Sequence, residues 1–401
     1  MTQQQPEHVA KPPSRRSATG LVIRGIIVLF GALWAWNFWQ LRQINQIVQV
    51  AERNGSVVDY HPSSARKVLG FNLLSTSGAP ARVSLARLQA EPGWYSRLRL
   101  LPELNQLDLS RSNIENTDLR YLEGMRELED LSLWRTRISD AGLSHLARLT
   151  SLQILDLSET QVTDEGLAAL AQLDQLGTLF LHNTKVTGRG LRHLTNLTDL
   201  TRLTLGGSPI DDDGLDAVSL FPRLTDLNLS ATSISDDGIV SLGRLTKLTF
   251  LSLDRTNITD AGLVHLGGLH ELRLLQLSQN RITGEGLGPV AALPNLRLLA
   301  LQHCEVTDDG LKALADAPSL VELRLCEDRI TDEGLRHLAR MPVLGKLILS
   351  SRSITDAGLA YLVTAEELHT LELFPTSVTD AGVEVLEKAH GRLKVRRYGH
   401  R

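Results

Sequence analysis

The 401-residue chain contains few aromatic or sulfur-containing residues and little net charge. Aromatic residues make up only 4% of it, so its core must be built from aliphatic side chains. Two cysteines exclude a disulfide-stapled scaffold and any four-thiolate metal site. The 42 Lys and Arg residues are balanced by 46 Asp and Glu residues, which argues against a polycation that binds nucleic acid along its length.

Leucine, by contrast, is in large excess: it occupies 78 positions, about a fifth of the chain. From Leu104 onward it recurs every 24 residues, and three such columns begin at Leu104, Leu107 and Leu109. All three columns hold leucine in each of twelve units. A further column, five residues on, is Ile or Val in every copy from Ile114 to Val378. This periodicity predicts a repeat array covering about three quarters of the chain.

One unit reads L-x-x-L-x-L-x-x-T-x-I/V-T-D-x-G-L-x-x-L-x-x-L-x-x. Its first half alternates apolar and polar residues, which predicts a short strand with its leucines facing inward. A Thr/Ser-Asp pair then offers a helix N-cap. The leucines that follow, such as Leu143, Leu146 and Leu149, have helical spacing. One strand and one helix cannot cover these leucines, so the units are expected to stack into a solenoid.

These motifs resemble the leucine-rich repeat superfamily. The variant T-x-I/V-T-D-x-G-L is most similar to repeats of bacterial membrane-anchored proteins and of F-box-associated subunits. The resemblance implies an α/β solenoid with a parallel β-sheet on its concave face and helices on its convex face, and a surface that binds proteins. The chain departs from the pattern at the buried turn position, where Ser or Thr mostly replaces the usual Asn. Asp328 and Arg352 occupy this column in adjacent units, and we expect them to pair as half-buried charges.

Enzyme motifs are missing: the sequence has no phosphate-binding glycine loop, no zinc-binding helix motif and no nucleophile elbow. Cys304 is a nucleophile by residue type, but it falls in the buried turn column, where we expect an inert thiol. Four histidines share a helix column, yet they lie two or three units apart, too far to hold one metal ion. They are His145, His193, His265 and His337. We therefore expect a protein that is not an enzyme and that uses no cofactor or metal.

The N-terminal residues are typical of a membrane-anchored protein. Residues 1–20 are rich in Gln, Pro and Ser, which predicts a disordered tail. The apolar stretch Leu21–Leu41 is long enough for a single transmembrane helix, with Trp34, Trp36 and Trp39 clustered at one end. More basic residues precede this stretch than follow it, which places the N-terminus in the cytoplasm and the repeats on the outer side, periplasmic or extracellular. A cleaved signal peptide and a buried core helix are the alternatives.

The array is expected to have atypical ends. Counting back 24 residues from the first unit places Val83 and Leu85 in strand columns and Tyr95 and Leu98 in helix columns. This unit is degenerate, as the end of a solenoid requires. The last residues are basic and break the register, which predicts a basic tail or a closing strand. The predicted parts are a tail (1–20), a transmembrane helix (21–41), a juxtamembrane helix and connector (42–79), a capping repeat (80–103), twelve repeats (104–391) and a basic tail (392–401).

The exposed strand positions vary between units, and variable side chains on a rigid curved sheet suit recognition. Most are small or polar, but three adjacent units place an apolar stripe in one column, flanked by arginines. Such a stripe is typical of an interaction surface, although it could instead be partly covered and simply pack. A second candidate, ranked lower because the intervening unit lacks an aromatic residue, consists of two aromatic residues and a histidine. The stripe is Phe250, Leu274 and Leu298 with Arg273, Arg297 and Arg324, and the second candidate is Trp134, Phe180 and His182.

The sequence thus predicts a membrane-anchored, non-enzymatic protein-binding or scaffold protein that uses the concave face of a solenoid. The expected partner is a protein whose identity the sequence does not reveal, and not a nucleic acid. The alternative is a specificity subunit or effector that delivers targets to an enzyme complex, similar to F-box-associated leucine-rich repeat proteins. The first hundred residues contain no evident F-box-like helical bundle, which counts against it.

Overall fold

The computed structural model describes residues 42–53, 80–326 and 329–398, together with Ala35, Trp39 and three short strands between residues 58 and 72. The predicted tail and most of the predicted transmembrane segment lie outside these residues. Within the part described, no helix is both long and apolar enough to cross a membrane.

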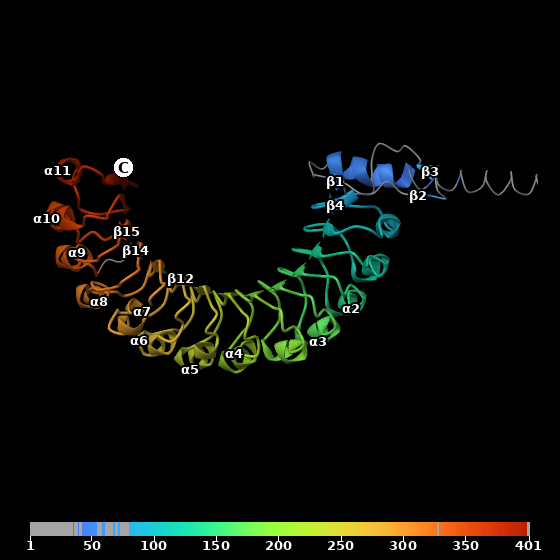
Figure 1. Ribbon diagram of the computed structural model, residues 1–401, viewed down its shortest axis with the longest axis horizontal. Coiled ribbons are helices and arrows are strands. Elements are labelled where there is room, and N and C mark those ends of the chain that lie inside the picture. Colours follow the sequence, from blue (N-terminus) through green and yellow to red (C-terminus); the bar gives the residue numbers. More distant parts are fainter. Residues whose placement is uncertain are drawn as a thin grey trace, which may run out of the picture.

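One long sheet forms the centre of the described fold (Figure 1). Strand order follows chain order, and adjacent parallel strands pair residues 24 positions apart, as Leu227 pairs with Leu251. β1 (Val58–Tyr60) joins antiparallel to β4 (Pro80–Ser84), while β2 (Lys67–Val68) and β3 (Phe71–Asn72) form a separate pair. The other strands are β5 (Gln106–Asp108), β6 (Asp130–Ser132), β7 (Ile154–Asp156), β8 (Thr178–Phe180), β9 (Arg202–Thr204), β10 (Asp226–Asn228), β11 (Phe250–Ser252), β12 (Leu274–Gln276), β13 (Leu298–Ala300), β14 (Glu322–Cys326), β15 (Lys346–Ser350), β16 (Thr370–Leu373) and β17 (Lys394–Arg397).

Figure 1 shows an arc with the strands along its inner side and the helices along its outer side. This arrangement confirms the predicted α/β solenoid with a concave parallel sheet. The α-helices are α2 (Asp140–Leu143), α3 (Asp164–Leu167), α4 (Asp212–Val218), α5 (Asp236–Ile239), α6 (Asp260–Leu263), α7 (Gly288–Ala291), α8 (Asp308–Lys312), α9 (Asp332–Leu338), α10 (Asp356–Tyr361) and α11 (Asp380–His390). The 3₁₀ helices are η1 (Trp94–Leu100), η2 (Asn116–Tyr121), η3 (Ala168–Leu170), η4 (Arg189–Leu194), η5 (Val240–Arg244), η6 (Val264–Leu266) and η7 (Leu362–Thr364).

The convex elements are shorter than the predicted helices, and several are 3₁₀ turns. The leucine spacing explains this, because Leu167, Leu170 and Leu173 follow one another at a period of three. A 3₁₀ helix has three residues per turn, so it aligns all three on one face, and all three are fully buried. α3 accordingly continues as η3.

The repeated leucines form one continuous core, in which the three strand columns are almost completely buried. From Ser112 to Cys304 the turn column is buried too, and its hydroxyls bond to backbone carbonyls as predicted. Thr136 Oγ1 donates to the Leu133 carbonyl at 2.7 Å, and Ser208 Oγ reaches the preceding unit, donating to the Leu181 carbonyl at 2.8 Å. Each turn therefore has its backbone satisfied inside the core.

The Asp of the T-D-x-G motif links its unit to the next, except in the units where Gly188 and Gly284 replace it. The Asp140 carboxylate accepts hydrogen bonds from the backbone N–H of Thr163 (2.8 Å) and from its hydroxyl (2.7 Å). Thr163 is the N-cap of α3 and itself accepts from the Glu165 N–H. A Cβ on Gly166 would overlap the Asp140 carboxylate, so glycine at this position leaves room for the link.

A helix formed by residues 42–53 covers the N-terminal end of the core (Figure 1). Its Ile47 and Ala51 are fully buried and belong to the same hydrophobic cluster as Tyr95 and Leu98. The degenerate unit at 80–103 is present as β4 and η1, as predicted, but the open end of the core is covered by the segment that we had assigned to a juxtamembrane helix. This helix is amphipathic, and its apolar side packs on the degenerate unit at 80–103.

The C-terminal end corrects the prediction of a basic tail for 392–401. Lys394–Arg397 form β17, which pairs in parallel with β16. Arg397 forms an ion pair with Asp380, and its Nη2 donates to the Val378 carbonyl at 2.9 Å. The Tyr398 ring stacks on Phe374 with centroids 5.0 Å apart. These contacts favour the closing strand that the sequence left as the other interpretation.

The predicted half-buried pair of Asp328 and Arg352 is not supported. Arg352 is exposed, and Asp328 lies outside the described residues. β14 and β15 are two residues longer than most strands, which shifts the following turn. Ser351 is buried instead, and its Oγ donates to the Ile330 carbonyl at 2.6 Å.

Candidate functional site

The apolar stripe predicted on the concave face is continuous. Phe250 pairs in register with Leu274, and Leu274 with Leu298. All three side chains are half-buried, while Arg273 and Arg297 are exposed just before the strands begin. The structure thus brings these residues together, but their partial burial fits both packing and binding.

Arg324, the third arginine predicted to flank the stripe, belongs to a charge network. Its Nε lies 2.8 Å from Glu322 Oε1, and Lys346 Nζ lies 3.3 Å from the same oxygen. Glu372 continues the network with Lys346 and Arg396, each at 3.8 Å. Because Glu322 pairs in register with Leu298, the stripe ends where this network begins. The sequence pattern did not reveal the network, since its members alternate between two columns.

The lower-ranked candidate lines a hollow on the concave face. Trp134, Phe180 and His182 line a depression of about 380 Å³. The other lining residues are Asp156, Ser158, Glu159, Thr204 and Asn228. We call this the concave hollow.

Two arginines and a glutamate hold the Trp134 side chain in place. The Arg111 guanidinium lies 4.3 Å from the centre of the Trp134 ring, a cation–π contact. Trp134 Nε1 donates to Glu159 Oε1 at 3.2 Å, and Arg135 Nε lies 3.5 Å from Glu159 Oε2. Arg111, Arg135 and Glu159 all have positive φ angles between 53° and 57°, which form the sharp corner after each strand.

Asp156 is one of two carboxylates that line the concave hollow, the other being Glu159. Burial raises the pKa of Asp156, hydrogen bonds from Ser158 lower it, the charge of Asp108 raises it and His182 lowers it. The net effect is a pKa above the ordinary value. Its Oδ1 accepts from the Ser158 N–H at 2.9 Å. Within the described residues, Asp156 forms no ion pair with a lysine or arginine.

The acidic character extends over the neighbouring strands. Asp108 lies in the same strand column as Asp156, two strands away, and Asp130 lies on the strand between them. Burial raises the pKa of Asp130, Arg82 lowers it, and the charges of Asp108 and Asp156 raise it further. We call these three carboxylates the acidic row.

One side of the concave hollow contains an unsatisfied polar atom. Thr204 Oγ1 is buried and has no hydrogen-bond partner among the described residues. Next to it, Gly206 leaves space, because a Cβ there would lie 3.0 Å from both His182 Nδ1 and Asn228 Oδ1. The hollow therefore combines aromatic surface with a carboxylate that forms no ion pair with a described lysine or arginine.

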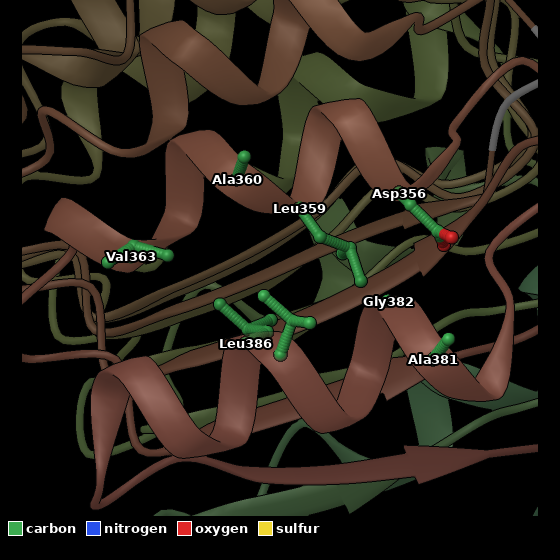
Figure 2. A pocket seen from close by; sticks show the side chains of 8 residues that line it. Asp356, Leu359, Ala360, Val363, Ala381, Gly382 and Leu386 are labelled. Atoms are coloured by element: carbon green, nitrogen blue, oxygen red, sulfur yellow. The ribbon is translucent and has the colours of Figure 1, made fainter.

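A second hollow, of about 250 Å³, lies between α10 and α11 on the convex side. Figure 2 shows Leu359 and Leu386 facing each other across it. Its one carboxylate, Asp356, accepts hydrogen bonds from the N–H and hydroxyl of Thr379. Val385 at its edge is 66% exposed. The lining is otherwise apolar and carries no catalytic group.

Residues with catalytic or metal-binding potential are dispersed. Cys304 is buried, and its Sγ contacts the Leu277 carbonyl at 3.2 Å. His145 lies 2.6 Å from Glu123 on the convex surface, and His193 and His265 are exposed. Over the described ranges, no group of three or more His, Cys, Asp or Glu residues is placed to hold a metal ion.

The family model for the leucine-rich repeat matches residues 148–171, 244–267, 269–291 and 292–315. The solved structure of an internalin from Listeria monocytogenes is similar over 80% of this chain and 87% of its own, with 23% sequence identity and a TM-score of 0.61. A leucine-rich repeat protein from Leptospira interrogans is similar over 78% of this chain and 95% of its own, with 17% identity and a TM-score of 0.45. No curated protein matches the chain.

The stacked strand-and-turn units and the repeat matches define a solenoid class of protein. Four of its units match the leucine-rich repeat family model, and the fold is that of a leucine-rich repeat solenoid.

Proposed function

We propose that this chain is a non-enzymatic scaffold that binds a protein partner on its concave face and is held at a membrane by one helix. The concave hollow is the observation that supports this best. It brings Trp134 and Phe180 together with polar and charged side chains on one rigid sheet, and aromatic residues of this kind are enriched at protein-binding hot spots. Leucine-rich repeats as a class support a binding role.

The membrane anchor rests on the sequence of Leu21–Leu41 and on the excess of basic residues before it. The proposed orientation keeps the N-terminus in the cytoplasm and the repeats outside. The helix of residues 42–53 begins directly after the anchor and packs on the first unit. An anchor at Leu21–Leu41 would therefore hold the N-terminal end of the arc close to the membrane. A specificity subunit for an enzyme complex finds no support in the fold or in the comparisons.

Site-specific photocrosslinking tests the binding face. A benzophenone amino acid replaces Gln276 on the concave sheet or, as the matched control, Val264, which is 56% exposed on the convex side. In cells that express the full chain, we expect protein adducts from position 276 and not from 264. Equal adducts at both positions would show that binding does not select the concave face.

A reporter that is active only in the cytoplasm, fused after Arg401, tests the orientation. We expect no reporter activity, with activity restored when the same reporter precedes Met1. Activity of the C-terminal fusion would overturn the outside location of the repeats.

A further inference from the structure

We propose that the concave hollow is a receptor for a cationic side chain, arginine in preference to lysine, presented by an extended basic segment of the protein partner. This inference rests on the proposed binding function and adds to it the chemistry of the partner.

The lining of the concave hollow has the two features that bind a guanidinium. Aromatic faces attract cations, and Arg stacks on them through its flat, weakly hydrated guanidinium. Phe180 and Trp134 supply such surface on either side of the strand that carries Asp156. A carboxylate accepts two parallel N–H bonds from the same group, which a lysine ammonium cannot match in geometry.

Asp156 forms no ion pair with a lysine or arginine among the described residues, and His182 is the cationic group whose charge lowers its pKa. Arg111 is stacked on Trp134, and Arg135 faces Glu159. Neither forms an ion pair with Asp156. A cation from a partner would therefore meet a half-buried carboxylate that has no competing lysine or arginine.

The fold itself does not require a charge at position 156. The structural role of Asp156 is to accept the N–H of Ser158, two residues on. Asn228 has the same role in β10, where its Oδ1 accepts the Ser230 N–H at 2.9 Å. Since an amide oxygen forms this turn equally well, the negative charge serves no local purpose. Asparagine is therefore a substitution that removes the charge and keeps the turn.

The acidic row points to a peptide segment and not to an isolated small cation. Asp108 and Asp156 are two strands apart in one column, a separation of about 9.6 Å at about 4.8 Å per strand. An extended peptide advances about 3.3 Å per residue and turns alternate side chains to one face, so two basic residues two positions apart, about 6.6 Å, both face the sheet, and their long side chains cover the remaining distance. A segment with such spacing would place one cation at each carboxylate.

Fluorescence anisotropy with labelled peptides tests the inference on the purified full chain in detergent micelles. The probe is a nine-residue peptide with two arginines two positions apart among Gly and Ser, and parallel peptides carry lysine or glutamate instead. We expect the arginine peptide to bind several-fold more tightly than the lysine peptide, and the glutamate peptide not to bind. Equal or tighter binding of the glutamate peptide would overturn the charge assignment.

Two matched variants separate the hollow from general attraction to an acidic surface. Asp156→Asn removes the charge in the hollow, and Asp254→Asn removes one from further along the column that holds Trp134 and His182. The pKa of Asp254 is also raised by burial, which makes it a close control. We expect about tenfold weaker arginine binding for Asp156→Asn, the size of one lost charge-assisted contact, and less than about twofold for Asp254→Asn. Equal losses, or no loss, would overturn the proposed receptor.

Phe180→Leu provides a second variant that keeps the charge and the apolar volume. It should weaken binding of the arginine peptide more than binding of the lysine peptide, because it removes the aromatic face and leaves the Asp156 carboxylate in place. An identical effect on both peptides would contradict stacking. The thermal midpoint of each variant is measured alongside, and a variant counts only if its midpoint stays within a few degrees of the parent.

Failure of this inference and failure of the proposed function give different results. Partner adducts at position 276 together with no arginine-peptide binding would sink the cationic receptor and leave the concave scaffold standing. Adducts at neither concave nor convex positions would contradict the scaffold itself.

Discussion

Two aspartates show how the same side chain serves different ends in this chain. Asp156 carries a raised pKa, so burial disfavours its charged form. For Asp260, burial alone raises the pKa, but hydrogen bonds from Gly286, Thr283 and Gly284 outweigh it and bring the pKa below the ordinary 3.8. Asp260 is therefore held in its charged form by the fold, whereas at Asp156 burial outweighs the hydrogen bonds from Ser158 and the charge of His182.

Replacing Asp260 by alanine should destabilise the solenoid by about 2–4 kcal/mol, because three N–H groups and a hydroxyl lose their acceptor. Since the folded pKa of Asp260 lies below the unfolded one, its contribution is present above the unfolded value and is lost as pH falls through the folded value. Urea denaturation from pH 7 down to pH 3 measures both effects. The control is Asp309→Ala at an exposed position, expected to change stability by less than about 0.5 kcal/mol.

Replacing Asp156 by asparagine should have the opposite sign. Its raised pKa means that the folded chain takes up a proton more readily than the unfolded chain, so the carboxylate costs stability at neutral pH. That cost is relieved as pH falls through the folded pKa towards the unfolded one. We expect a higher melting temperature for Asp156→Asn at pH 7 and a difference that shrinks in acid. A lower melting temperature at pH 7 would assign Asp156 a structural role.

At the scale of the element, the T-D-x-G motif is a link between units and not only a local cap. The sequence correctly predicted that Thr163 caps its own helix, because that contact joins residues two positions apart, but Ser139, predicted in the same role, makes no side-chain cap bond. The sequence did not predict that the Asp reaches the next unit, since that contact depends on how closely the turns stack. The carboxylate of Asp140 fills the space that the missing Cβ of Gly166 leaves.

A double-mutant cycle tests this link. Gly166→Ala alone should destabilise the chain by about 2 kcal/mol or more, because its Cβ overlaps the Asp140 carboxylate in a buried setting. With Asp140→Ala already present, the same substitution should cost much less, a coupling of about 1 kcal/mol or more. Thermal or chemical denaturation of the four proteins measures it. If the free-energy changes of the two substitutions simply add, the cost of Gly166→Ala does not come from the Asp140 carboxylate.

The elements were otherwise predictable to different degrees. Strand positions followed from the leucine columns, because alternation at a fixed period leaves one choice of inward face. Helix type did not follow, since leucines three apart fit both an α-helix and a 3₁₀ turn until the length of the unit is known. The concave hollow was underestimated for a related reason. Trp134 and Phe180 are two units apart, yet large aromatic side chains reach across about 9.6 Å of sheet.

At the scale of the whole molecule, the ends are where the repeat rule stops. Interior units cover one another, but each terminal unit leaves one core face open. At the C-terminus, β17 and the Tyr398–Phe374 stack extend and close the sheet. At the N-terminus, the helix of residues 42–53 buries Ile47 against the first unit. The sequence pattern predicted this helix but not its contact with the core, because the apolar residues of the helix also continue the apolar stretch Leu21–Leu41 before it.

This cap leads to a prediction about how the molecule unfolds. Ile47→Asp places a charge in the contact between the helix and the first unit, a change that should cost about 3 kcal/mol or more locally. Because each unit of a solenoid is stabilised by contacts with its direct neighbours, the loss of hydrogen-exchange protection should be largest in β4 and β5 and should decrease along the array. Hydrogen exchange with mass spectrometry on the full chain measures this gradient, with the exposed neighbour Gln49→Asp as the matched control. Uniform loss of protection from β4 to β17 would show that the array unfolds as one cooperative unit, and unchanged protection in β4 would show that the helix is not a cap. The Asp156 region, three strands from the cap, should stay folded in the variant, so that partner binding in the concave hollow survives when the N-terminal end has opened.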